Sequence, residues 1–163
     1  MKALTILQPW ASLMACGAKK IETRSWATKY RGPLAIHAAK HINTPKCAWE
    51  EPFKSELIKA GMMASVYSGK GFAFNLGNNG MVVAIAELVD CVKVVSTVNG
   101  SLGPIEVPVH KAELENGITV RENEFFFGNY EIGRYAWMFE NVRRINPIPA
   151  KGKQRLWNWE AEK

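Results

Sequence analysis

Apolar residues near the start of the chain recur with the period of a helix. Trp10, Leu13 and Met14 lie at intervals of three and four residues, so they fall on one helical face. Pro9 suits the first turn of such a helix, and Gly17 suits the residue that follows its end. The sequence therefore predicts a helix that begins at Pro9 and ends before Gly17.

After this helix the pattern changes to a period of two, which is typical of a strand. Lys20, Glu22 and Arg24 would then point to one face of the strand. Ile21 and Thr23 would point to the other face. A strand over these residues makes Glu22 and Arg24 neighbours on a polar face.

Lys19 is a second candidate for the lysine of this polar cluster. It has the opposite parity to Glu22, so it can join the cluster only if it belongs to the turn before the strand. Lys20 has the matching parity and competes with it. The sequence alone leaves both lysines open.

The rest of the chain alternates between short apolar runs and turn-forming segments. It predicts strands over 2–7, 33–39, 82–95, 135–140 and 142–145. It also predicts a helix over 47–60 that Pro52 starts or breaks, a helical turn or short helix over 110–116, and loops over 61–80 and 99–108. Many short strands with two or three inserted helices indicate an α+β fold built on a small β-barrel. We expect a single domain over residues 1–163, because this length suits one buried core and is short for two.

Composition indicates an ordinary globular chain with an excess of basic residues. Hydrophobic residues make up 47% of the chain and charged residues 22%, which argues against extensive disorder. The formal net charge of +6 favours polyanionic partners, although it also serves solubility. Apolar runs are far shorter than the roughly 20 residues of a membrane span, and no secretory signal is apparent. We therefore expect a cytoplasmic protein without membrane contact.

The cysteines and histidines do not have the spacing of a metal site. Cys16, Cys47 and Cys91 form no Cys-x-x-Cys pair, so reduced thiols are expected. His37 and His41 lie four residues apart, but His37 falls within a predicted strand and His41 after it. They therefore do not share a helical face, and solvated or hydrogen-bonded histidines are expected. We expect neither a metal nor another cofactor.

Lys19, Glu22 and Arg24 admit two interpretations. In the first they form a ligand site, where Arg24 grips a phosphate or carboxylate through two parallel hydrogen bonds and Lys19 supplies a second positive charge. In the second they form a structural ion-pair network, in which Glu22 neutralises the two cations. The residues alone favour neither.

Aromatic residues alternate with basic ones in two places. Trp26 precedes Lys29 and Arg31, while Trp157 follows Lys153 and Arg155. Such an arrangement can stack nucleic-acid bases and hold phosphates, although large aromatic side chains in a small barrel more often fill the core. We expect Trp26 to face a ligand and Trp157 to be structural.

Five segments carry a family resemblance. They are the motif G-x-K-x-x-E-x-R over 17–24, the opening L-Q-P-W over 7–10, the runs over 34–39 and 84–91, and the ending over 151–157. Together they resemble the ASCH family, a branch of the PUA-like β-barrels with members in bacteria, phages and animals. The resemblance implies a barrel beside a cleft that holds the motif lysine, acid and arginine, here Lys19, Glu22 and Arg24.

The resemblance also implies a function. RNA, or a modified nucleoside or nucleotide, is the expected ligand, with Lys19, Glu22 and Arg24 as the binding residues, and Trp26 joins them through its place among basic residues. Some small bacterial members are associated with hydrolysis of N4-acylated cytidines or of RNA, so a metal-independent amidohydrolase or ribonuclease that uses the same Lys19, Glu22 and Arg24 is the alternative. A protein-interaction adaptor is a third possibility, and its mark would be a large exposed apolar patch.

One position departs from the pattern of the hydrolases. Those enzymes carry a threonine three residues after the lysine, where this chain has Glu22. They also take an acidic partner from further along the chain, for which Glu87 and Glu113 are the candidates here. Binding is therefore expected before catalysis.

Overall fold

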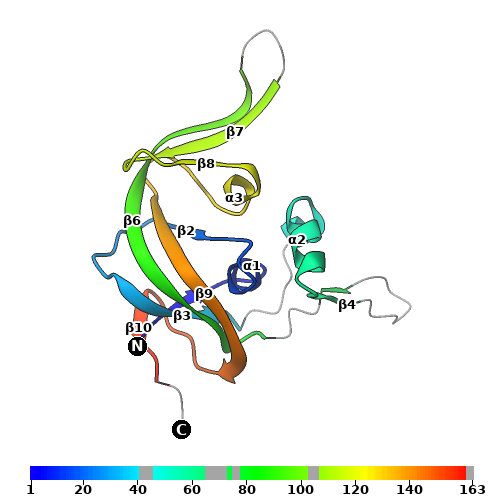
Figure 1. The fold of residues 1–163 in the computed structure, drawn as a ribbon, viewed down its shortest axis with the longest axis vertical. Helices are drawn as coiled ribbons and strands as arrows, with labels where there is room; N and C mark the ends of the chain where they lie inside the picture. The colour runs from blue at the N-terminus through cyan, green and yellow to red at the C-terminus, as the bar shows by residue number, and fades with distance from the viewer. Residues whose placement is uncertain (41–45, 65–72, 75–77, 103–106, 161–163) are drawn as a thin grey trace. The chain divides into compact units, whose positions relative to one another are not determined.

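The computed structural model describes residues 1–40, 46–64, 73–74, 78–102 and 107–160. Within them the chain forms ten strands, three α-helices and one 3₁₀ helix, η1 (Figure 1). In chain order these are β1 Lys2–Ile6, α1 Trp10–Ala15, β2 Ile21–Arg24, β3 Gly32–Ala38, η1 Lys46–Trp49, α2 Phe53–Lys59, β4 Met63–Ala64, β5 Ala73–Phe74, β6 Met81–Leu102, β7 Val107–Leu114, β8 Thr119–Arg121, α3 Glu122–Phe126, β9 Tyr135–Pro149 and β10 Leu156–Asn158. The predicted α+β class is confirmed.

The chain divides into two compact units. The first comprises residues 1–19, 33–87 and 141–163, and the second comprises 20–32 and 88–140. The long strands β6 and β9 contribute residues to both units. Among the described strands the mixed sheet is open, because β10 in the first unit and β8 in the second each pair along one side alone.

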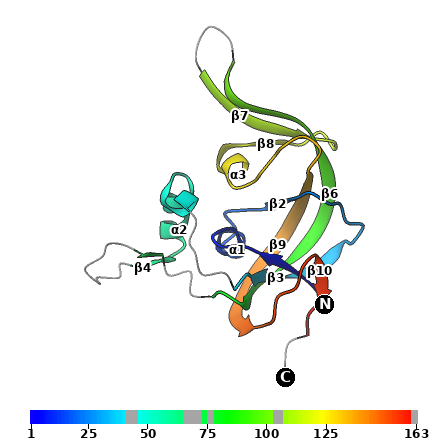
Figure 2. The ribbon, with the colours of Figure 1, turned by 180° about the vertical axis from the view of Figure 1, so that it is seen from behind.

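Strands of the first unit follow the order β10, β1, β3, β6. β1 pairs with β3 in parallel and with β10 antiparallel, and these three strands lie side by side in Figures 1 and 2. A parallel pair needs a crossover connection, and α1 lies within it. Trp10 at the start of α1 meets Phe53 of α2 edge-on, with ring centroids 6.0 Å apart. Burial of Leu13 and Met14 fixes α1 in the core of this unit.

The second unit is built from antiparallel pairs. β7 lies between β6 and β8, and β2 pairs with β9. The short helix α3 packs against β7 and β8 (Figure 1). Its Phe125 joins a buried cluster with Val94, Leu114 and Tyr130. This cluster is the apolar core on which the unit is assembled.

Local patterns predicted the first elements correctly. The helix from Pro9 is observed as α1, and the strand after it is observed as β2. The predicted helix over 47–60 is broken at Pro52, with η1 before the proline and α2 after it. Within the predicted loop over 61–80, β4 and β5 form a short antiparallel pair. Residues 65–72 and 75–77 of that loop lie outside the described residues.

The predicted short helix over 110–116 is wrong, because this segment belongs to β7. β7 pairs on one side with β6 and on the other with β8, so its backbone hydrogen bonds are made to other strands. Ala112 and Leu114 are buried two residues apart, which is the period of a strand. Part of the predicted loop over 99–108 is also strand, because β6 continues to Leu102.

No described helix has both the length and the apolar character that crossing a membrane requires.

Candidate functional site

Burial distinguishes the two candidate lysines. Gly17 ends α1 with a φ of +82°, and its N–H donates to the carbonyl of Met14 at 3.0 Å. The N–H of Lys19 then donates to the carbonyl of Leu13 at 3.1 Å, which fixes the backbone of the turn. The Lys19 side chain is 0% exposed, whereas Lys20 is exposed. A fully buried lysine is rare in proteins, so Lys19 is the unusual member of the pair.

Glu22 and Arg24 form an ion pair on one face of β2. Glu22 Oε1 and Arg24 Nε lie 3.3 Å apart, and their side chains are 13% and 26% exposed. Ile21 and Thr23 are buried at 7% each, as expected for the opposite face of a strand. The predicted alternation is therefore confirmed, and it leaves both charged groups within reach of solvent.

The start of β2 is fixed by a carboxylate from α3. Glu124 accepts hydrogen bonds from the N–H of Lys20 at 2.8 Å and of Ile21 at 3.1 Å. Glu124 lies 104 residues from Lys20 along the chain, so no local sequence pattern signals this contact. The two bonds hold the first residues of the strand that carries Glu22 and Arg24.

Trp26 lies just beyond β2 and packs against a buried partner. Its ring meets Trp137 edge-on, with centroids 4.5 Å apart, and the indole N–H of Trp137 donates to the carbonyl of Trp26 at 3.2 Å. Trp137 is fully buried on β9, directly opposite Glu22 in the strand pairing, while Trp26 is partly exposed. Trp26 therefore keeps a fixed position and an accessible surface.

Tyr130 is a polar group of this unit that the sequence analysis missed. It is 3% exposed, and its hydroxyl has no hydrogen-bond partner among the described residues. Burial, together with the negative charges of Glu124 and Glu22, raises the pKa of Tyr130 far above its usual range. The phenol therefore keeps its proton and remains a hydrogen-bond donor at physiological pH.

Comparison with known proteins shows the family of the chain. The model of the ASCH domain matches residues 4–149. The chain belongs to the ASCH domain family. This domain has a PUA-like fold that is associated with RNA binding.

Longer proteins also carry this domain. The chain is similar to activating signal cointegrator 1 of Homo sapiens, with 33% identity over 89 residues, and to that of Mus musculus, with 34% identity over 89 residues. Each match covers 54% of this chain and 14% of the relative, so the chain spans a small part of either protein.

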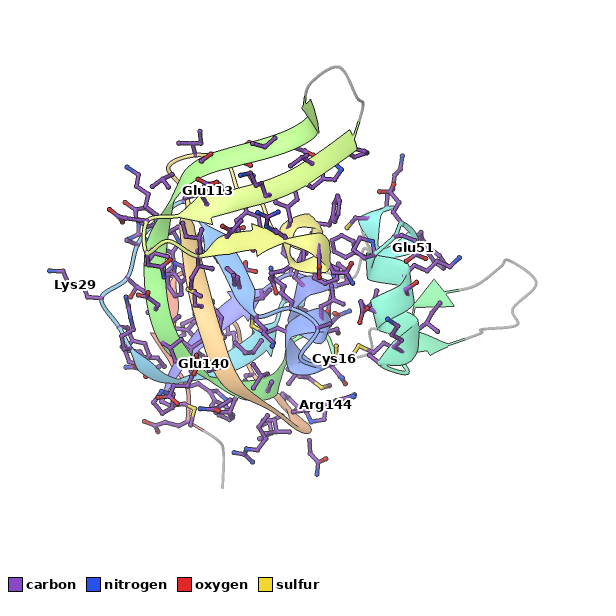
Figure 3. All side chains as sticks on the ribbon, turned by 45° about the horizontal axis from the view of Figure 1, so that its top comes forward. Cys16, Lys29, Glu51, Glu113, Glu140 and Arg144 are labelled. Atoms are coloured by element: carbon purple, nitrogen blue, oxygen red, sulfur yellow. The ribbon has the colours of Figure 1, made fainter. Side chains whose placement is uncertain are left out.

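The two candidates for a distal acid in this ASCH domain are both engaged with neighbours. Glu113 Oε1 accepts a hydrogen bond from Lys111 Nζ at 2.9 Å, and this contact lowers the pKa of its carboxyl group. Glu113 projects from β7 in Figure 3. Glu87 accepts a hydrogen bond from the side-chain amide of Asn141 at 3.2 Å. The lowered pKa of Glu113 is the opposite of the raised pKa that a general acid needs.

The loop after Trp26 carries two basic residues, of which Arg31 forms an ion pair and Lys29 extends into solvent. Arg31 Nη2 donates to Asp90 Oδ1 at 2.9 Å, in an ion pair whose side chains are 39% and 36% exposed. Lys29 extends outward from the ribbon (Figure 3) and is exposed. Lys29 is therefore the more accessible of the two basic residues near Trp26.

Trp157 and His37 are packed together in the first unit of this ASCH domain. Trp157 is 8% exposed and donates from its indole N–H to Thr5 Oγ1 at 3.2 Å. His37 is 1% exposed, and its Nε2 lies 3.1 Å from the carbonyl oxygen of Ala150. The expectations of a structural Trp157 and a hydrogen-bonded His37 agree with these contacts. His41 lies outside the described residues, within which no cluster of three His, Cys, Asp or Glu side chains could hold a metal.

Stability is expected to fall as the pH drops below about 6.5, the ordinary pKa of histidine. Burial lowers the pKa of His37, although its hydrogen bonds to the backbone of Ala150 and Gly80 oppose this. The unfolded chain therefore binds a proton before the folded chain does. Stability from the neutral His37 is present above the unfolded pKa and is lost as the pH falls through the folded pKa. Thermal melts at a series of pH values should show this loss, and His37→Gln should flatten it. An unchanged profile in the variant would assign the pH dependence to other groups.

Proposed function

We propose that this ASCH domain binds single-stranded RNA, or a modified nucleoside or nucleotide from it, at the polar face of β2. The observation that carries the proposal is the partly exposed ion pair of Glu22 and Arg24 beside Trp26. Three kinds of group that nucleotide recognition uses are supplied by one short segment. They are a guanidinium for phosphate, a carboxylate for base or sugar donors, and an aromatic ring for stacking.

Arg24 would hold the phosphate. A guanidinium presents five N–H donors in a planar fork that matches two phosphate oxygens. Glu22, 3.3 Å away, restrains the orientation of this fork before a ligand arrives. Both side chains are held on a strand that pairs with β9 and is fixed at its start by Glu124. Such a restrained group loses little freedom on binding.

Trp26 would stack on a base. Base-aromatic stacking contributes about 1–3 kcal/mol and tolerates any base, because every base has a π-face. Contact with Trp137 fixes the Trp26 ring, so stacking does not require the ring to be ordered first. The exposed Lys29, three residues further on, adds positive charge to the loop that follows Trp26.

Lys19 is retained in the proposal as the lysine of the motif. Its complete burial sets it apart from the exposed Lys20, which resembles an ordinary surface lysine. We therefore expect Lys19→Ala to weaken ligand binding and Lys20→Ala to leave it unchanged. Because Lys19 is buried, the comparison is to be made at a temperature where both variants are folded, as judged by circular dichroism.

RNA affinity is expected to fall steeply as salt rises. Phosphate contacts release counterions, so the logarithm of the binding constant falls by about 0.7 per contacted phosphate for each tenfold rise in salt. Anisotropy titrations of a labelled oligoribonucleotide at about 50 and 200 mM salt test this. An absence of binding at the lower salt would reject RNA as the ligand. Acetate release from N4-acetylcytidine by the folded protein would instead favour the hydrolase alternative.

A further inference from the structure

The first unit contains a pocket to which none of residues 17–24 contributes. Its volume is about 1050 Å³. The walls come from β1, from the end of β3, from the segment that enters β6 and from the segment that follows β9, with Thr5, His37, Lys40, Asn79, Lys151 and Lys153 among the lining residues. The pocket is therefore a feature of the first unit alone and separate in sequence from the motif.

Positive charge dominates the lining of this pocket. Lys40, Lys151 and Lys153 line it, and no aspartate or glutamate does among the described residues. All three lysines are exposed, and none has an ion-pair partner within the described part of the chain. Three ammonium groups around one hollow repel each other unless an anion lies between them. The lining thus matches an anionic ligand.

The segment that carries two of these lysines is fixed at both ends. Before Lys151, the N–H of Ala150 donates to the carbonyl of Gly80 at 3.0 Å, and the carbonyl of Ala150 lies 3.1 Å from His37 Nε2. At the other end, Thr5 Oγ1 donates to the carbonyl of Lys153 at 3.0 Å. The backbone between the two lysines is therefore ordered before any ligand binds.

Gly152 allows this segment to lie directly on His37. A Cβ atom at Gly152 would lie 2.4 Å from His37 Cε1 and 3.0 Å from Thr5 Oγ1, closer than real Cβ atoms approach the imidazole. Only glycine therefore fits between Lys151 and Lys153 in this position. Lys151 and Lys153, on either side of Gly152, both line the pocket.

Two buried polar atoms in the lining also lack partners. His37 Nδ1 and Asn79 Oδ1 have no hydrogen-bond partner within the described residues. Leaving a buried polar group unpaired costs about 1–3 kcal/mol, so such atoms mark places where a polar ligand or water would be favoured. Both atoms are acceptors, because His37 Nε2 carries the proton that faces the carbonyl of Ala150, so they suit a hydroxyl or N–H group of a nucleoside and not a phosphate oxygen.

We propose that this pocket binds the phosphate group of a nucleotide. Lysine is a common phosphate ligand as a point charge, and three of them match the charge and the oxygens of a phosphate. The volume of about 1050 Å³ slightly exceeds the range of about 300–1,000 Å³ for small-molecule sites, which leaves room for a nucleoside beside the phosphate. The phosphate has two sources, a free nucleotide and an RNA strand, and in the second case the inference rests on the proposed function.

The test compares two triple variants with equal changes in charge. Lys40→Gln/Lys151→Gln/Lys153→Gln removes the lysines of the pocket, and Lys46→Gln/Lys54→Gln/Lys93→Gln removes three lysines that do not line it. Isothermal titration with adenosine 5′-monophosphate and with adenosine measures the contribution of the phosphate. Salt titrations with the labelled oligoribonucleotide measure the phosphate contacts of the polymer. Circular dichroism confirms that both variants are folded.

For a free nucleotide, the wild type should bind the monophosphate at least tenfold more tightly than adenosine, and the pocket variant alone should lose this preference. For an RNA source, the magnitude of the slope of log affinity against log salt should fall by about 0.7 in the pocket variant alone, the value for the one phosphate that the three lysines hold. Either result supports the pocket. Equal behaviour of the two triple variants with both ligands would overturn it. If the wild type binds no RNA, the proposed function fails, while the monophosphate titration still decides the pocket.

Discussion

Trp137→Ala is expected to lower the free energy of unfolding by about 3–5 kcal/mol, the usual cost of deleting a large buried aromatic side chain. Trp137 is 0% exposed and contacts Trp26 edge-on at 4.5 Å. Its removal leaves a cavity beside the Trp26 ring and takes away the indole donor to the carbonyl of Trp26. Urea denaturation followed by tryptophan fluorescence or circular dichroism measures the loss.

Two comparison variants separate the loss of buried aromatic packing from the loss of the indole hydrogen bond. Trp137→Phe keeps an aromatic ring but removes the N–H donor, so it should cost less than the alanine variant. Trp49→Ala removes a tryptophan that is 40% exposed and should cost far less than Trp137→Ala. If the two alanine variants lost equal stability, the buried packing of Trp137 would contribute no more to stability than an exposed tryptophan does.

Arg24→Ala is expected to lower RNA affinity by about 10- to 100-fold. Hydrogen bonds to charged groups contribute about 1.5–3 kcal/mol, and each 1.4 kcal/mol is a factor of ten in affinity. Arg24→Lys should recover part of the loss, because it restores the charge but not the planar fork. Anisotropy titrations at one salt concentration measure all three proteins.

The stability of the Arg24 and Glu22 variants distinguishes a ligand-binding Arg24 from one that serves only in a structural ion pair. Both side chains of the pair with Glu22 keep some exposure, so Arg24→Ala and Glu22→Gln should shift the melting temperature only modestly. A loss of about 3–5 kcal/mol in either variant would show that the pair is chiefly structural. Arg121→Ala removes an exposed arginine of the same unit and should change neither affinity nor stability.

Sequence patterns predicted what depends on neighbouring residues. α1 follows from the spacing of Trp10, Leu13 and Met14, and its end follows from Gly17. β2 follows from a period of two, which also placed Glu22 and Arg24 on one face. These features are fixed within a few residues, so a pattern in the chain is enough to reveal them.

Features fixed by distant residues were not predicted. The helix expected over 110–116 is part of β7, because pairing with β6 and β8 overrides its local preference. Glu124 and Tyr130 lie about 100 residues from β2 along the chain, and nothing near them in sequence signals their contacts or their charge effects. The pocket of the first unit likewise gathers lysines from two distant segments.

The chain passes between its two compact units four times, after residues 19, 32, 87 and 140. Neither unit is therefore a continuous stretch of sequence. Any fragment that contains all of one unit also contains part of the other, and a truncation after residue 32 or after residue 87 removes residues from both. Separate expression of either unit would require new joins between chain segments, whereas circular permutation would keep every segment.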